Sequence, residues 1–125
     1  KMKSEFHNLS NYDPNENYFN AGLYITSLKF WKDNNCKSKI IKIMKQHKNS
    51  KKGLFLNGTQ PILNMVFYKN FKEIPKEWNV RGLGGSIVDK KYVSNAKGLH
   101  WNGRFKPWNK DGLNKQFWKP YNVLN

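Results

Sequence analysis

Apolar positions at helical spacing predict a long amphipathic helix over residues 29–48. Ile40, Ile41, Met44 and His47 fall on one face by that spacing, and lysines occupy the other face. We expect His47 to be a helix-end residue rather than a ligand, because a cationic side chain suits the negative end of the helix dipole.

Further helices are predicted later in the chain. Lys51–Gly53 interrupts the first helical pattern. Pro61 suits the start of a new helix, with Thr59 or Gln60 near its N-cap. Residues 92–97 predict a short helical turn, and aromatic and apolar residues at helical spacing predict a terminal helix over 112–121.

Short β-prone runs predict strands between the helices. Leu23–Leu28 predicts a buried strand, and Phe71–Ile74 predicts a short one. Residues 96–101 predict another short strand, which would deliver His100 to its C-terminal end. Ligands bind at that edge of open α/β sheets. The pattern contains no internal repeat and no linker that would divide the chain.

Composition favours a folded chain with a solvated, basic surface. The 125 residues include 15% aromatic side chains, too many for a disordered chain. The formal net charge of +15 invites a nucleic-acid interpretation, but Arg81 and Arg104 are the only arginines, whereas base recognition favours arginine. The lysines are dispersed and accompanied by many asparagines. We therefore expect no nucleic-acid partner, and a basic nucleic-acid binder is the third-ranked hypothesis.

Candidate features of cellular location are few. No run approaches the roughly 18 apolar residues that a membrane span needs, so a membrane anchor would lie outside this sequence. The triplets Asn8-Leu9-Ser10 and Asn57-Gly58-Thr59 match the N-glycosylation pattern and fit a secretory lumen. Cys36 is the single cysteine, which excludes an internal disulfide and a cysteine-based metal site.

The segment His100–Trp108 concentrates the candidate chemistry. His100 can ligate a divalent metal ion, Gly103 allows close backbone approach to a ligand, and Lys106 suits a phosphate. Pro107 fixes the chain directly afterwards. The alternative is an aromatic turn whose histidine and tryptophans fill a core, and these residues alone favour neither interpretation.

A second candidate lies at Asn20-Ala21-Gly22. These small residues open the predicted strand over 23–28, where they would let a ligand or another backbone approach. The competing interpretation is a glycine bulge at the start of a strand. On these residues alone, the glycine bulge is the favoured interpretation.

Five blocks, in order, resemble glycosyltransferase family 8. Phe19–Gly22 resembles the family's FNAG strand, and Gly58–Pro61 resembles the GT-x-P pattern of its eukaryotic branches. Trp78–Gly84 resembles their W-(N/H)-V-x-GLG block, and His100–Trp108 resembles the HxxGxxKPW signature. Phe117–Tyr121 is similar to the closing W-x-x-Y.

The resemblance implies an α/β fold of the GT-A nucleotide-diphospho-sugar transferase type. Residues 18–125 would form the C-terminal half of one catalytic domain, with 1–17 as a polar loop leading into it. The implied activity is transfer of a hexosyl or glycuronosyl group from a UDP-sugar to a glycan or other acceptor, with Mn²⁺ as cofactor and retained configuration. The implied location is the Golgi lumen, with a membrane anchor outside this chain.

Roles carry over by matching position. The resemblance makes His100 a metal ligand and places Gly103 and Lys106 at the diphosphate. The two tryptophans of that segment, Trp101 and Trp108, are expected to be scaffold.

The remaining implied site residues come from two earlier blocks. The resemblance implies that Asn20 lines the sugar site, which Ala21 and Gly22 shape. Gln60 would correspond to the catalytic-site Gln near the anomeric carbon in members that carry Asp-Gln there. In this sequence Thr59 stands in place of that Asp.

One family motif is absent from this sequence. The Asp-x-Asp motif carries most of the metal coordination in the family, and no Asp-x-Asp occurs here. We therefore expect these 125 residues alone to be inactive. Thr59 in place of Asp motivates a second hypothesis, a non-catalytic module of the same fold that binds glycans or nucleotide.

Overall fold

The computed structural model describes residues 12–13, 15–55 and 58–123, which belong to two compact units. The first unit extends to Glu73 and the second begins at Ile74. Most of the predicted N-terminal loop, the triplet at 8–10 and Asn57 lie outside the described residues. The assignment of 18–125 to one catalytic domain stays a prediction.

Three helices build the first unit: α1 (Leu28–Asp33), α2 (Cys36–Asn49) and α3 (Thr59–Val66). The single helix predicted over 29–48 is therefore two. The break falls where Asn35 adopts a left-handed conformation with φ of 50°, which asparagine tolerates better than most residues. The Ser27 side chain caps α1 by accepting from the Phe30 amide at 3.3 Å.

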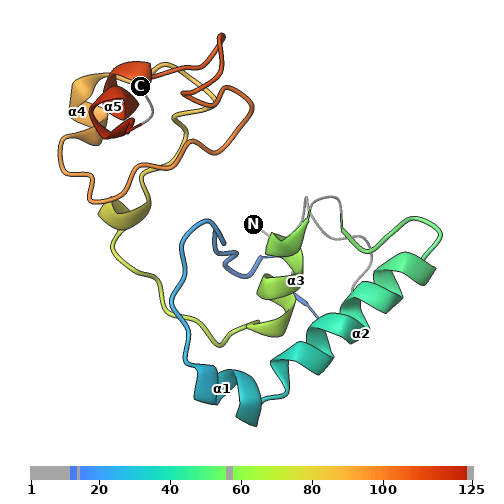
Figure 1. Ribbon diagram of the computed structural model, residues 1–125. Coiled ribbons are helices and arrows are strands. Elements are labelled where there is room, and N and C mark those ends of the chain that lie inside the picture. Colours follow the sequence, from blue (N-terminus) through green and yellow to red (C-terminus); the bar gives the residue numbers. More distant parts are fainter. Residues whose placement is uncertain (1–11, 14, 56–57, 124–125) are drawn as a thin grey trace. The chain divides into compact units, whose positions relative to one another are not determined.

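Helix α2 packs beside α3 through a face that differs from the predicted one (Figure 1). Its core side carries Cys36, Ile40, Ile43 and His47, which recur at intervals of three or four residues. Ile41 and Met44, predicted to face the core, are 41% and 53% exposed. The buried face of α2 is thus rotated about the helix axis relative to the predicted face. The helix has more apolar residues than can pack against α3, so some of them remain exposed.

The role predicted for His47 is confirmed as structural. Its Nδ1 atom accepts a hydrogen bond from the Leu54 amide at 3.0 Å, and its ring stacks on Phe55 with centroids 4.0 Å apart. Lys51–Gly53 follows the end of α2 as predicted, and Gly53 has φ of 68°.

Two apolar clusters form the core of this unit. One contains Ile43, Phe55, Ile62 and Met65, and the other contains Cys36, Leu63 and Phe67. Both draw on α2 and α3, so the pairing of these helices fixes where the N-terminal end of α3 lies.

Two predicted strands are wrong. Leu23–Leu28 has no β-ladder, and Ile25 and Leu28 are 88% and 77% exposed. Phe71–Ile74 is also irregular. A strand is stabilised by hydrogen bonds to a neighbouring strand, and within the described residues no strand lies beside either run.

The second unit consists of loops held by short helical turns. These are η2 (Lys76–Asn79), α4 (Lys90–Val93), α5 (Lys115–Trp118) and η3 (Lys119–Tyr121). The predicted turn over 92–97 thus lies slightly earlier, and the predicted terminal helix is two short turns. The strand predicted over 96–101 reduces to a parallel bridge between Val80 and Leu99. Leu83 and Pro107 are fully buried at the centre of this unit.

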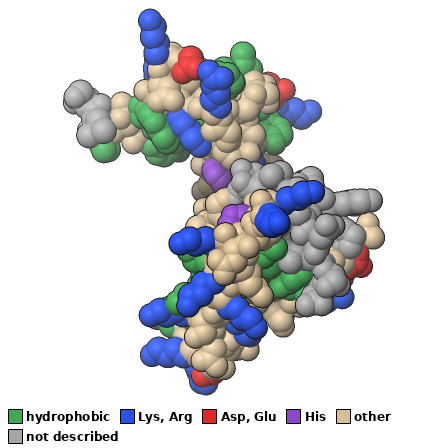
Figure 2. All heavy atoms as spheres, turned by 90° about the vertical axis from the view of Figure 1, so that its right-hand side faces the viewer, with side chains coloured by type: hydrophobic (Ala, Val, Ile, Leu, Met, Phe, Trp, Pro, Cys, Tyr) green, Lys and Arg blue, Asp and Glu red, His purple; other side chains and the backbone are tan. Residues whose placement is uncertain are grey.

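Lysine and arginine side chains are spread over the visible surface of both units (Figure 2). The dispersed pattern agrees with the predicted solvated basic surface. Among the described residues, no helix is both long and apolar enough to cross a membrane.

Candidate functional site

The turn Phe19–Gly22 is fastened to α3 by the side chain of Gln60. The Gln60 Oε1 atom accepts from the Asn20 side-chain amide at 3.1 Å and from the Ala21 backbone amide at 2.9 Å. Asn20 in turn accepts from the Gly22 amide at 3.0 Å. The structure therefore brings together all four site residues predicted in the first unit, in a hydrogen-bonded turn rather than a strand.

Asn64 holds the same turn one helical turn later. Its Oδ1 accepts from the Phe19 amide at 2.8 Å, and its Nδ2 donates to the Phe19 carbonyl at 2.9 Å and to the Gln60 carbonyl at 3.0 Å. Asn64 is only 2% exposed, so these bonds satisfy a buried amide. Residues four apart share a helix face, which is why Gln60 and Asn64 act on one segment.

His100 is oriented by Asn79 in the second unit. Its Nδ1 lies 2.9 Å from Asn79 Oδ1, and its backbone amide donates to the Val80 carbonyl at 2.8 Å. A carboxamide oxygen only accepts hydrogen bonds, so Nδ1 carries the proton and Nε2 carries the lone pair. This arrangement matches the way metal-binding histidines are commonly oriented.

The charge state of His100 is set by its surroundings. Burial, and then the positive charges of Lys106 and Arg81, hold the pKa of His100 below its usual value. The imidazole is therefore neutral at pH 7. A neutral ring with its lone pair on Nε2 is the form that can ligate a metal ion.

Gly103 lies where the loop crosses the glycine-rich turn. Its φ of 101° is one that L side chains rarely adopt, and a Cβ there would lie 2.7 Å from the Gly84 carbonyl oxygen. A Cβ on Gly84 would meet the Asn102 carbonyl oxygen at 2.7 Å. Phe105 donates its amide to Gly84 at 3.0 Å. Both glycines are thus required by backbone packing, whether or not a ligand binds.

Lys106 is held within the same loop. Its Nζ donates to the Trp101 carbonyl oxygen, and the side chain is only partly exposed. The Trp101 indole donates to the Leu113 carbonyl at 2.9 Å, so its predicted scaffold role is confirmed. Trp108 is 64% exposed, so it does not fill the core of the described unit, and its scaffold role stays a prediction. The core-filling interpretation therefore fails for Trp108, while Pro107 does fill the core.

Three asparagines that hold candidate residues, one in the first unit and two in the second, escaped the sequence interpretation. Asn64 and Asn79 position the two groups of candidate residues, and Asn114 supports the glycine-rich turn. Asn114 is 6% exposed, donates to Leu83 and Ser86, each at 2.8 Å, and accepts from Val88 at 3.0 Å. The sequence did contain a signal for Asn64: it lies four residues after Gln60, a spacing that places both side chains on one face of a helix. In a chain this rich in asparagine, composition hid the others.

The described residues contain part of a metal site at most. His100 supplies one suitable nitrogen, but no cluster of three His, Cys, Asp or Glu side chains lies within the described ranges. A Mn²⁺ ion prefers several oxygen or nitrogen ligands, so His100 fits as one ligand of a set completed by other groups.

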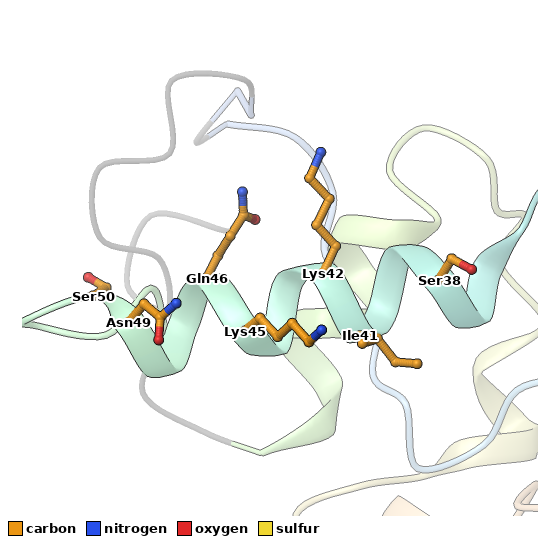
Figure 3. A pocket seen from close by; sticks show the side chains of 7 residues that line it. All are labelled: Ser38, Ile41, Lys42, Lys45, Gln46, Asn49 and Ser50. Carbon is orange, nitrogen blue, oxygen red and sulfur yellow. The ribbon is translucent and has the colours of Figure 1, made fainter.

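A surface hollow runs along α2, and its lining residues differ from the candidate site residues (Figure 3). Figure 3 shows polar and lysine side chains projecting from this one helix. Its lining residues are Ser38, Ile41, Lys42, Lys45, Gln46, Asn49 and Ser50. None of the predicted site residues is among them.

Comparison with known proteins gives a consistent match. Residues 1–112 match the model of the family described as Glycosyl transferase family 8. The chain is 37% identical over 113 residues to mouse (Mus musculus) Glycosyltransferase 8 domain-containing protein 1, covering 84% of this chain and 30% of the relative. The human (Homo sapiens) protein of that name is 36% identical over 113 residues, with the same coverage.

A plant relative matches as well. The Arabidopsis thaliana protein named Probable galacturonosyltransferase-like 9 is 33% identical over 115 residues, covering 85% of this chain and 29% of the relative. The chain thus spans less than a third of the length of these curated relatives. No solved structure matches it.

Proposed function

The chain belongs to glycosyltransferase family 8, and from this membership we propose that the protein is a UDP-sugar-dependent hexosyl- or glycuronosyltransferase. In this proposal the acceptor is a glycan or another hydroxyl-bearing molecule. The described residues would be the C-terminal part of a GT-A catalytic domain. Transfer replaces the bond between the anomeric carbon and the β-phosphate oxygen of UDP by a bond to the acceptor oxygen, with retained configuration.

Within the described residues, the geometry that supports the proposal is the presence of His100, oriented by Asn79, and of Lys106 in one loop. Negative charge develops on the leaving diphosphate, and a preorganised cation stabilises it. Lys106 supplies that cation from a side chain already held by the Trp101 carbonyl. Because the positions of such groups are set before the substrate arrives, little reorganisation is needed at the reacting step.

His100 would provide one ligand for Mn²⁺. A divalent ion bound there would act as a Lewis acid toward the diphosphate. Asn79 fixes the proton on Nδ1 and so leaves Nε2 to bind the ion. The remaining ligands would come from a part of the protein outside this sequence, where the family carries its Asp-x-Asp.

Asn20 would contact the donor sugar, with Gly22 leaving room beside it. Gln60 Oε1 is engaged by Asn20 and Ala21, so in this arrangement Gln60 positions the sugar-binding turn. Any contact of Gln60 with the anomeric carbon region would then be made by its side-chain Nε2 atom, because Oε1 is already bonded to the turn. A Golgi lumenal location with a membrane anchor elsewhere in the protein completes the proposal.

The test is Mn²⁺ binding by a His100 variant of the full-length protein. We expect His100→Ala to weaken Mn²⁺ affinity, measured by titration in the presence of UDP, and to raise the Mn²⁺ concentration needed for transfer. Circular dichroism would verify that the variant is folded. Unchanged Mn²⁺ affinity would show that His100 serves packing alone and would remove the main support for the proposed metal site.

A second candidate function rests on Thr59. This residue, which is exposed at the first position of α3, stands where members with Asp-Gln carry a carboxylate. A non-catalytic module would bind glycan or nucleotide without turnover. Detection of sugar transfer or UDP-sugar hydrolysis by the full-length protein would reject this second candidate.

A further inference from the structure

We propose that Arg81 is an additional binding residue for the donor diphosphate, acting beside His100 and Lys106. This inference rests on the proposed function and extends it to a residue that the family blocks leave open. Arg81 occupies the variable position between Val80 and Gly82 in the Trp78–Gly84 block.

Register places Arg81 beside His100. The parallel bridge joins Val80 to Leu99, with the Val80 amide donating to Gly98 at 2.9 Å and the His100 amide donating to Val80 at 2.8 Å. Arg81 follows Val80 and His100 follows Leu99, so Arg81 and His100 occupy the next pair of positions in this register. Paired positions in neighbouring strands are about 4.8 Å apart and direct their side chains to the same side. The contact between His100 and Asn79, which lies two residues before Arg81, agrees with this shared side.

The peptide group that follows Arg81 is held at both of its polar atoms. The Tyr92 hydroxyl donates to the Arg81 carbonyl at 3.1 Å, and the Gly82 amide donates to the Asn102 side chain. Gly82 has φ of 95°, so the chain turns sharply immediately after Arg81. An exposed guanidinium on a fixed backbone loses less freedom when it binds an anion.

Arg81 takes part in no ion pair within the part of the chain that the structure describes. Among the described residues, the ion pairs are Lys29–Asp33 and Lys69–Glu16, and neither involves Arg81. From residue 74 onward the sequence has ten Lys and Arg against three Asp and Glu, so background charge also favours an anion.

The chemistry of guanidinium suits a diphosphate better than a single charge would. Arginine offers a planar fork of N–H donors that binds two phosphate oxygens at once, whereas lysine acts as a point charge. Arg81 would therefore orient the diphosphate, and Lys106 would offset the charge that builds on it. The ligand is the diphosphate itself rather than the uracil or the sugar.

The experiment measures UDP and uridine affinity by calorimetric titration of the full-length protein. We expect Arg81→Gln to weaken UDP binding roughly 10- to 100-fold, the range for losing a charge-assisted hydrogen bond. Uridine, which lacks phosphate, should bind equally well to both proteins. Arg81→Lys should recover part of the loss, because it keeps the charge without the fork. Lys119→Gln, on the exposed terminal turn, removes the same charge and should leave UDP affinity unchanged.

Three outcomes would overturn the inference. One is unchanged UDP affinity in folded Arg81→Gln, and another is an equal loss in Lys119→Gln, which would assign the effect to net charge. The third is a loss confined to UDP-glucuronate while UDP binds normally, which would place Arg81 at a sugar carboxylate. If Arg81→Gln fails to fold by circular dichroism, full UDP affinity in Arg81→Lys overturns the bidentate role.

Failure of this inference can be separated from failure of the proposed function. If Lys106→Ala loses UDP affinity while Arg81→Gln keeps it, the proposed function stands and only the role of Arg81 is rejected. If neither substitution changes UDP affinity, both the inference and the proposed diphosphate site are rejected.

Discussion

Asn64→Ala should loosen the candidate sugar-binding turn by removing its buried anchor. Asn64 is 2% exposed and makes two hydrogen bonds to Phe19, at 2.8 and 2.9 Å, besides one to the Gln60 carbonyl. The Gln60 carbonyl retains its place in the helix ladder, so its lost bond matters least. Each lost bond to Phe19 is worth about 1 kcal/mol, and leaving buried groups unsatisfied costs more. We therefore expect a loss of roughly 2–4 kcal/mol in the free energy of unfolding.

Two measurements test this expectation. Urea unfolding followed by circular dichroism reports the stability, since α2 and α3 supply much of the helical signal. Hydrogen exchange at the Phe19 amide reports the anchor directly, because that N–H donates to Asn64. Asn70→Ala is the matched control: Asn70 is exposed and its side chain donates locally to the Tyr68 carbonyl at 3.1 Å. Its cost should stay within about 0.5 kcal/mol.

Two results would contradict a buried amide anchor. If Asn64→Ala costs no more than Asn70→Ala and the Phe19 amide keeps its protection, the turn does not depend on the buried amide. A second contradicting result would be a lower free energy of unfolding in Asn64→Ala while the Phe19 amide still exchanges only through global unfolding of the first unit. The turn would then not depend on a local anchor. Asn64→Gln retains the amide one methylene further out. If hydrogen bonding rather than side-chain volume decides the cost, its loss in the free energy of unfolding should fall between the losses of Asn64→Ala and Asn70→Ala.

Two further predictions concern the second unit in the full-length protein. Lys106→Ala should lower turnover by roughly 10²–10³, the usual cost of losing one preorganised charge stabiliser; near-normal turnover in a steady-state transfer assay would reject its role. Asn79→Ala should weaken Mn²⁺ affinity roughly 10- to 100-fold by releasing the His100 ring, as titration would measure. Equal affinity in the Asn79 variant and the unmodified protein would show that its hydrogen bond does not orient the ligand.

Helices of the first unit were largely predictable because helix formation depends on neighbours in sequence. The helix predicted over 29–48 exists as α1 and α2 with a break at Asn35, and α3 begins close to Pro61. The sequence could not show which side of α2 faces the core. Ile41 and Ile43 are equally apolar, and only the position of α3 decides that Ile43 is buried.

Strands were not predictable in the same way, because a strand depends on a partner that can lie far away in sequence. Leu23–Leu28 has the composition of a strand and remains exposed and unpaired within the described residues. The site divides similarly. The family blocks make Asn20, Gln60 and His100 candidates, and their roles stay predictions, but the asparagines that hold them are found only from three-dimensional contacts.

Cys36 has a practical consequence for studying this chain. It is the single thiol in the sequence, it is 1% exposed, and it lies in the cluster with Leu63 and Phe67 where α2 begins. A thiol-reactive dye can reach it only when that cluster opens, so the labelling rate measures how often α2 and α3 separate. The native sequence thus contains a site-specific reporter of local unfolding in the first unit, and no cysteine has to be introduced or removed from these 125 residues to use it.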